Sequence, residues 1–137
     1  MGNHVNAKCI SRVLFNQSLL QTLILDKNSI RHLEKDVFKS VGLLNLRIIS
    51  LRDCGVEYVD DNAFRDLKIM TSLDLSENNI TKIFPKTFDG NDNLKTLRLS
   101  SNPITALDYY QGCTSMNRHF FHPRICPRTF PKCCLKL

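Results

Sequence analysis

Cysteines are the most reactive side chains of this 137-residue chain, and their spacing divides most of them into two kinds. Cys54 stands alone within an apolar pattern, which predicts a small buried residue with a free thiol. The C-terminal end holds a cluster that can form two disulfides in an oxidising compartment, with three pairings left open by the sequence. The members of this cluster are Cys113, Cys126, Cys133 and Cys134.

The same end of the chain carries two weaker chemical signals. His119 and His122, together with Cys126 and Cys133, offer zinc-binding atoms, but their spacing does not match the common paired-ligand patterns. Residues 134–137 resemble a prenylation motif with lysine where an aliphatic residue is expected. A metal-linked or lipid-linked protein is therefore an alternative interpretation, while the favoured prediction is a chain without metal or cofactor.

Motifs for catalysis do not stand out in the sequence. The five glycines are isolated from one another, so no glycine-rich phosphate loop is formed. Serine, histidine and aspartate do not combine into a recognisable nucleophile motif. The sequence predicts a protein that is not an enzyme.

Two tripeptides have the form that accepts an N-linked glycan, which is asparagine, any residue except proline, and then serine or threonine. They begin at Asn16 and at Asn79. If the chain is secreted, both are candidate modification sites, and the expected surface position of Asn79 makes it the better of the two.

An internal repeat organises the central part of the chain. Four segments share the pattern L-x-x-L-x-L-x-x-N-x-I, with related apolar residues at some positions. The asparagine position is occupied in turn by Asn28, Cys54, Asn78 and Asn102, so the steps are 26, 24 and 24 residues. Such a fixed period predicts stacked coils, each contributing one short strand. The Asn or Cys turns inward after the strand, where its side chain can bond unpaired backbone groups.

The strand at the centre of each repeat should bury alternate residues and expose the others. The exposed residues form columns along the predicted parallel sheet. Oppositely charged neighbours occur at Asp26 with Arg52, Lys27 with Asp53, and Asp74 with Arg98. Adjacent opposite charges can either hold the register of the sheet or form a polar surface for a protein partner. The candidate ligand-binding residues on this concave face are Ile24, Ser50, Arg52, Asp74, Ser76 and Arg98.

Charge separates the repeats from the C-terminal end of the chain. The formal net charge of +6 is concentrated in the last 24 residues, which carry five basic residues and no acidic one. Residues 1–113 are nearly neutral, so nucleic-acid binding by the concave face is not predicted. The predicted organisation is an N-terminal flank at 1–19, repeats at 20–112 and a basic, cysteine-containing tail or cap at 113–137.

The repeat resembles the 24-residue "typical" class of leucine-rich repeats, found in Toll-like receptors, Slit-like proteins and small leucine-rich extracellular proteins. The segment from Leu73 to Thr81, followed by Phe88, carries this resemblance most closely. The resemblance implies an α/β fold in which a right-handed solenoid has a short parallel concave sheet and an irregular convex side. It also implies a recognition module without catalysis, whose partner is a protein ligand or receptor subunit.

The cellular location that we expect follows from the resemblance to extracellular repeat proteins. We find no secretory signal in the first 20 residues and no apolar run long enough to insert into a membrane. We therefore expect an extracellular or cell-surface domain that is part of a longer chain. A cytoplasmic leucine-rich-repeat scaffold with the same fold is the alternative.

Overall fold

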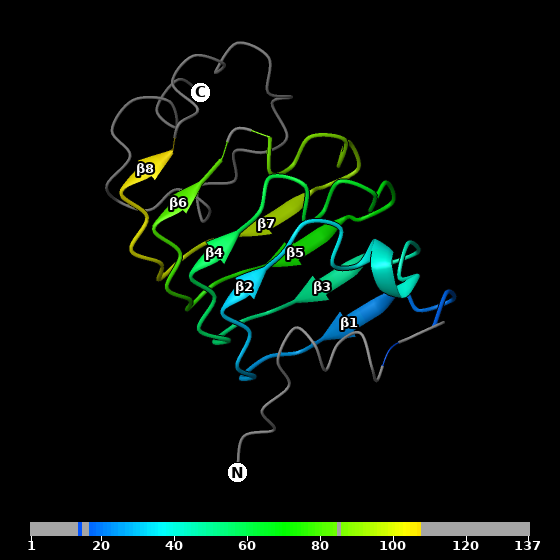
Figure 1. The fold of residues 1–137 in the computed structure, drawn as a ribbon, viewed down its shortest axis with the longest axis horizontal. Helices are drawn as coiled ribbons and strands as arrows, with labels where there is room; N and C mark the ends of the chain where they lie inside the picture. Colours follow the sequence, from blue (N-terminus) through cyan, green and yellow to red (C-terminus); the bar gives the residue numbers. More distant parts are fainter. Residues whose placement is uncertain (1–13, 15–16, 85, 108–137) are drawn as a thin grey trace.

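The protein is described by a computed structural model, which places residue 14, residues 17–84 and residues 86–107. The chain winds through successive coils, and each coil begins with a three-residue strand (Figure 1). These strands are β1 (Thr22–Ile24), β3 (Ile48–Ser50), β5 (Ser72–Asp74) and β7 (Thr96–Arg98). They form one parallel sheet in the order β1-β3-β5-β7.

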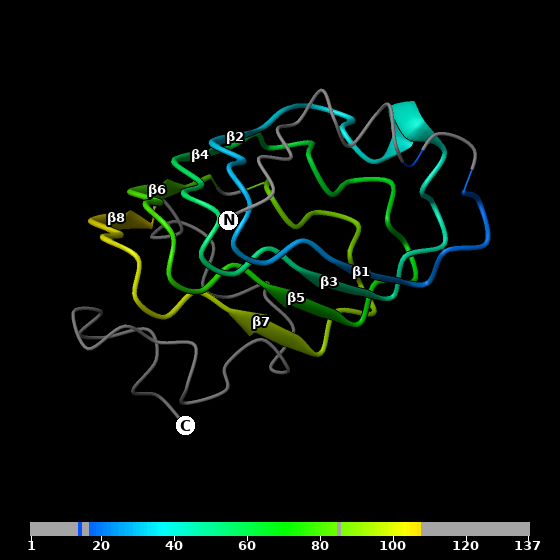
Figure 2. The ribbon, with the colours of Figure 1, turned by 90° about the horizontal axis from the view of Figure 1, so that it is seen from below.

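A second set of short strands lies across the coil from this sheet (Figure 2). These strands are β2 (His32–Leu33), β4 (Tyr58–Val59), β6 (Lys82–Ile83) and β8 (Ala106–Leu107). β2 pairs with β4 and β6 pairs with β8, both in parallel. Part of the side predicted to be irregular therefore has regular pairing, and a single 3-10 turn, η1 (Lys39–Val41), is its one helical element within the described residues.

The register of the main sheet agrees with the predicted repeat. Leu23, Ile49, Leu73 and Leu97 stand side by side in successive strands. All four are buried, because alternate side chains of a strand point to opposite faces and the inward ones meet the core. The prediction of a leucine-rich-repeat solenoid with a parallel sheet is confirmed. The other face of the sheet points away from the core and carries Thr22, Ile24 and the equivalent residues of the other strands. We call it the outer sheet face; it is the face predicted to be concave.

Phenylalanines fill the wide part of the coil. Phe38, Phe64 and Phe88 occupy the same position in three repeats, and all are buried. The ring centroids of Phe38 and Phe64 are 5.6 Å apart, and those of Phe64 and Phe88 are 6.0 Å apart. Both pairs are stacked, with interplanar angles of 22° and 21°. Such aromatic contacts add to the apolar burial that holds neighbouring coils together.

Candidate functional site

The outer sheet face has an apolar end and a charged end. Ile24 on β1 and Ile48 on β3 are 65% and 44% exposed, which is unusual for large apolar side chains. Towards β7 the same face carries Asp74 and Arg98, which stand directly opposite each other in register. Five of the six predicted ligand-binding residues are at least partly exposed on this face, and Ser76 is the exception.

Ser76 is only 6% exposed, so the expectation that its side chain faces solvent on this face is wrong. Its hydroxyl donates to the Oδ1 of Asp74, and its backbone N–H donates to the same oxygen at 2.9 Å. The Asp74 carboxylate closes a local turn over the end of β5, and this turn covers Ser76. Ser76 therefore holds the Asp74 carboxylate in its orientation.

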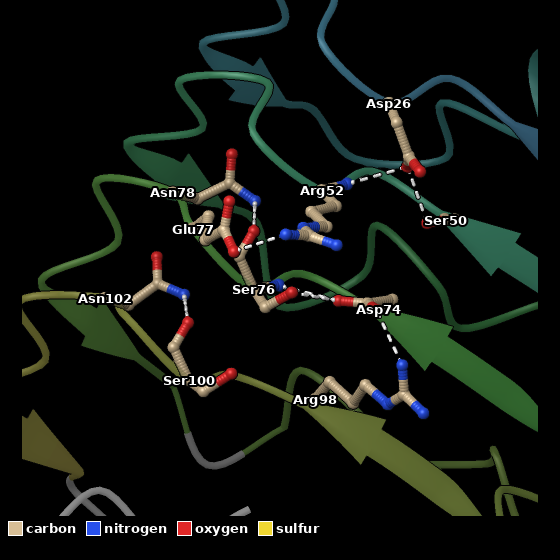
Figure 3. Close-up of polar contacts among 10 residues, drawn as sticks. All are labelled: Asp26, Ser50, Arg52, Asp74, Ser76, Glu77, Asn78, Arg98, Ser100 and Asn102. Atoms are coloured by element: carbon tan, nitrogen blue, oxygen red, sulfur yellow. Dashed lines mark hydrogen bonds and ion pairs between the residues drawn. The ribbon is translucent and has the colours of Figure 1, made fainter.

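Asp74 also meets the neighbouring strand. Its Oδ2 lies 3.4 Å from the Nη1 of Arg98, as the charge pattern predicted (Figure 3). The Asp74 side chain is 16% exposed and that of Arg98 is 62% exposed. The carboxylate is thus fixed within the sheet, and the guanidinium extends from it towards solvent.

Arg52 makes a different ion pair from the predicted one. Its Nη2 lies 2.6 Å from the Oε1 of Glu77, and this hydrogen bond raises the pKa of the Arg52 guanidinium (Figure 3). Asp26 receives instead the backbone N–H of Arg52 at 3.0 Å and the hydroxyl of Ser50. The predicted Asp26–Arg52 side-chain pair is therefore wrong, because the Asp26 carboxylate is bound to the chain of the next coil.

The predicted Lys27–Asp53 pair is wrong as well: within the described residues no ion pair joins them. Lys27 and Asp53 have φ angles of 61° and 55°, which lie in the left-handed region. They belong to the turn at the end of the strand, so the cross-strand pairing rule does not apply to them. Glu77 has the same conformation, with φ at 57°, and from this turn position it reaches Arg52.

The Asn78 side chain joins two coils through five hydrogen bonds. Its Oδ1 accepts the backbone N–H groups of Cys54 and Val56, at 2.9 and 3.0 Å. Its Nδ2 donates to the carbonyls of Leu51, Leu75 and Ser76. Asn78 is 4% exposed, so these bonds supply partners to polar backbone groups in the interior of the coil.

Asn102 repeats this arrangement in the next coil. Its Oδ1 accepts the N–H of Ile80 at 3.0 Å, and its Nδ2 donates to the carbonyls of Leu75 and Leu99. A longer contact of 3.5 Å reaches the Ser100 carbonyl (Figure 3). The predicted inward position of the ladder asparagines thus has a clear structural role.

Cys54 fills the ladder position of the second coil with a thiol. Its Sγ donates to the Leu25 carbonyl at 3.0 Å. In the next coil, the Nδ2 of Asn78 makes the equivalent bond to the Leu51 carbonyl. A thiol sulfur is only a weak hydrogen-bond acceptor. The Ile30 N–H therefore donates to the backbone carbonyl of Cys54 at 2.9 Å, whereas the equivalent Val56 N–H donates to the side chain of Asn78. Cys54 is buried and free, and burial raises the pKa of its thiol. The sequence predicted this free buried cysteine correctly.

Asn28 begins the ladder and has the fewest hydrogen bonds of its asparagines within the described residues. Its Nδ2 donates to the carbonyls of Leu25 and Asp26, at 2.7 and 3.4 Å. Its Oδ1 is buried and has no hydrogen-bond partner among the described residues. At Asn78 and Asn102 the same atom accepts N–H groups from the coil before.

Three residues after the buried phenylalanine, two coils carry an apolar residue, Val41 and Leu67, whereas the next coil carries Asn91. It occupies the position of Leu67 in the coil before, and it is 1% exposed. Its Nδ2 donates to the carbonyls of Phe64 and Leu67, at 2.8 and 3.2 Å, while its Oδ1 has no partner within the described chain. The polar residue at an apolar repeat position thus indicated a side chain that bonds the backbone of the preceding coil.

An aromatic group on the opposite side of the coil was not predicted. The Tyr58 ring packs edge-on against His32 and Phe84, with centroids 6.3 and 5.9 Å apart. Tyr58 is 44% exposed. The three rings come from three neighbouring coils, so only the stacking of the second set of strands brings them together.

Several predicted sites lie outside the described residues. These are the glycan candidate Asn16, the zinc and prenylation candidates, and the possible disulfides of Cys113, Cys126, Cys133 and Cys134. Among the residues that are described, no group of three or more His, Cys, Asp or Glu side chains is placed to hold a metal ion. In that same part of the chain no helix is long and apolar enough to cross a membrane.

Comparison with known proteins supports the repeat assignment. Residues 44–104 match the family model "Leucine rich repeat". Human leucine-rich repeat-containing protein 3B is 34% identical over 103 residues, which cover 74% of this chain and 37% of that protein. Human Toll-like receptor 5 is 33% identical over 108 residues, covering 76% of this chain and 12% of the receptor. The chain thus spans little more than a third of the length of the first relative and much less of the second.

A solved structure gives the same result for the fold. The crystal structure of the TLR13–ssRNA13 complex superimposes with a TM-score of 0.56 and 25% identity, covering 77% of this chain and 18% of that one. The period, the stacked parallel strands and the Asn/Cys ladder agree with these likenesses. The repeat region of this chain belongs to the leucine-rich-repeat family.

Proposed function

We propose that the chain is a non-enzymatic recognition module that binds a protein ligand through the outer sheet face, the predicted concave surface. The observation that carries this proposal is the arrangement of Arg52 and Arg98. Each guanidinium is more than half exposed, and each is held by a carboxylate of the same surface. Arginine held in one orientation can bind a carboxylate or carbonyl of a partner with little loss of conformational freedom.

The apolar end of the same face supplies the other half of a protein interface. Ile24 and Ile48 belong to neighbouring strands and stand diagonally across the register, within reach of one ligand side chain. Protein interfaces commonly combine an apolar centre with arginine and a polar rim. The outer sheet face offers both within four strands, and its nearly neutral charge does not favour nucleic acid.

The relatives support a role in recognition. The similarity to Toll-like receptor 5 is to a protein named as a receptor, and the TLR13 structure is a complex with single-stranded RNA. We infer that this chain acts at the cell surface or outside the cell as part of a longer protein. For its ligand we favour a protein over RNA, because the four strands of the main sheet carry one basic residue, Arg98, and one acidic residue, Asp74.

The test uses charge variants of the Asp74–Arg98 pair. A partner is first identified by screening the chain against displayed cell-surface and secreted proteins, and its binding is then measured with purified proteins. We expect Arg98→Glu to weaken binding about thirtyfold or more, since loss of a close interfacial charge costs about 2 kcal/mol or more. The matched control is Glu57→Lys, which alters the Arg31–Glu57 pair on a different part of the coil and should leave binding unchanged.

The exchange Asp74→Arg with Arg98→Asp separates recognition from simple stabilisation. It restores an ion pair between β5 and β7 but removes the bonds that Ser76 donates to Asp74, so binding is compared only in protein shown to be folded, and it reverses the charge order that a ligand meets. We expect binding to stay weak in this double variant. Recovery of full binding would show that the pair only holds the sheet, and binding of single-stranded RNA in place of any protein would contradict the proposed class of partner.

A further inference from the structure

We propose that Asn79 is the acceptor of an N-linked glycan, attached in the turn between β5 and β6. The proposal rests on the secretory location inferred under the proposed function, and it adds a covalent modification that the recognition role does not require. Asn79 is followed by Ile80 and Thr81, which completes the acceptor tripeptide. The surroundings of its side chain decide whether a large polar group fits at this position.

The side chain of Asn79 is exposed and carries no hydrogen bond among the described residues. Only its backbone is engaged, through the N–H that donates to the Val56 carbonyl at 2.8 Å. A glycan on Nδ2 would therefore break no hydrogen bond among the described residues. The Thr81 side chain is exposed as well, so the whole acceptor tripeptide lies at the surface apart from the buried Ile80.

The neighbouring coils leave room beside Asn79. The same repeat position is occupied by Gly55 in the coil before and by Pro103 in the coil after. A Cβ atom placed on Gly55 would meet nothing within 4 Å, so the surface there is open. Long side chains at these positions would crowd the first sugar, and neither neighbour has one.

The adjacent asparagine shows how specific this placement is. Asn78 is buried, and both of its amide atoms bond the backbone of two coils. Ile80 stands two residues after it, where the acceptor tripeptide needs serine or threonine, so Asn78 lacks the motif too. Neighbouring positions of the chain thus carry one amide that holds the solenoid together and one amide that is free to react.

The attachment is a group transfer from a lipid-diphosphate-linked oligosaccharide, catalysed by the transferase of the secretory pathway. The Nδ2 of Asn79 attacks C1 of the first sugar, a C–N bond forms and the bond from C1 to the phosphate oxygen breaks. The lipid diphosphate leaves with the bonding electrons, and Nδ2 loses one proton to a base of the transferase. No oxidant or reductant is needed.

The experiment expresses the full chain behind a secretion signal, with an extra acceptor tripeptide in a C-terminal tag. Glycosylation of the tag reports that the chain reached the compartment. The secreted protein is treated with peptide N-glycosidase in heavy-oxygen water, and peptide mass spectrometry locates the converted residues. We expect conversion at Asn79 in most molecules.

Three variants complete this test in an Asn16→Gln background, which removes the other acceptor tripeptide. Asn79→Gln and Thr81→Ala should each abolish the glycan, whereas Thr81→Ser preserves the acceptor tripeptide and should retain it. Unmodified Asn79 in molecules with a glycosylated tag would overturn the proposal.

Protein from its natural source distinguishes this proposal from the proposed function. If Asn79 accepts a glycan in the directed experiment but natural protein shows no mobility shift with the glycosidase, the inferred secretory location is wrong. If natural protein is secreted and Asn79 stays unmodified, the modification site is wrong and the recognition role is unaffected.

Discussion

At the scale of single residues, the ladder position is filled by asparagine or cysteine, and these side chains differ in how many buried backbone groups they bond. Asn78 satisfies donors and acceptors of two coils at once, because an amide has both an oxygen and an NH₂ group. Cys54 supplies the donor alone, and backbone pairing between Ile30 and Cys54 replaces the missing acceptor. Asn28 has the acceptor, but no N–H group of the described residues donates to it.

We predict that Asn78→Ala destabilises the chain by roughly 3–5 kcal/mol, since it leaves several buried backbone groups without partners at about 1–3 kcal/mol each. Asn79→Ala, one residue away at the surface, should change stability by less than about 0.5 kcal/mol. Urea unfolding followed by circular dichroism measures both. Similar losses for the two variants would mean that the hydrogen bonds of Asn78 do not stabilise the solenoid.

At the scale of elements, each strand of the main sheet ends in the same strained turn. Lys27, Asp53, Glu77 and Ser101 hold equivalent places, and all have φ angles between 55° and 61°. The left-handed conformation costs about 1–2 kcal/mol for a residue other than glycine. The backbone N–H groups of Lys27, Asp53 and Glu77 offset part of this cost by donating across to Arg52, Ser76 and Ser100.

The Asn91 position gives a prediction for the apolar columns. We expect Asn91→Leu to stabilise the chain by roughly 1 kcal/mol, because leucine removes an unpaired buried oxygen and adds apolar burial. The carbonyls that Asn91 now contacts keep backbone donors, the N–H of Leu67 for Phe64 and the N–H of Met70 for Leu67. Thermal unfolding would measure the gain, with the exposed Asn93→Leu as a control expected to give none. A less stable Asn91→Leu variant would show that bonding between coils matters more than apolar packing here.

The sequence predicted the sheet and the ladder because both depend on a fixed period. Burial of Leu73 and alignment of Asp74 with Arg98 required only alternation along a strand and a 24-residue step. The ion pair of Arg52 was missed because it depends on the left-handed turn at Glu77, and no glycine marks that turn. The predicted exposure of Ser76 failed for a related reason: its hydroxyl donates to the Asp74 carboxylate, and the turn that this bond closes buries it.

At the scale of the whole molecule, every coil of the described chain bonds mainly to the coil on either side. Stability of such a stack is close to a sum of coil and neighbour terms, so it need not be uniform along the molecule. The centre has both the stacked Phe64 ring and the fully bonded Asn78. The first coil has the ladder asparagine whose acceptor is unused among the described residues.

We therefore predict a gradient of amide hydrogen exchange along the stack. The N–H groups of Cys54 and Val56, both bound by Asn78, should exchange slowest, and those of residues 22–30 should exchange faster. A difference of about 1–2 kcal/mol in opening free energy is expected from one fully bonded asparagine. Nuclear magnetic resonance or mass spectrometry would record it, and uniform protection across all four strands would contradict it.

The buried thiol of Cys54 can report how often the first two coils separate. With the other five cysteines replaced, a thiol reagent can react only when the second coil separates from the first and breaks the bond to the Leu25 carbonyl. The raised pKa of the folded thiol adds a second barrier, because the thiolate is the reactive form. As pH rises past the ordinary pKa of a thiol, about 8.5, the opened thiol ionises more readily than the closed one, so rising pH favours the opened state. The rate of labelling then measures how often the second coil separates from the first, a motion that a ligand bound across β1 and β3 would slow.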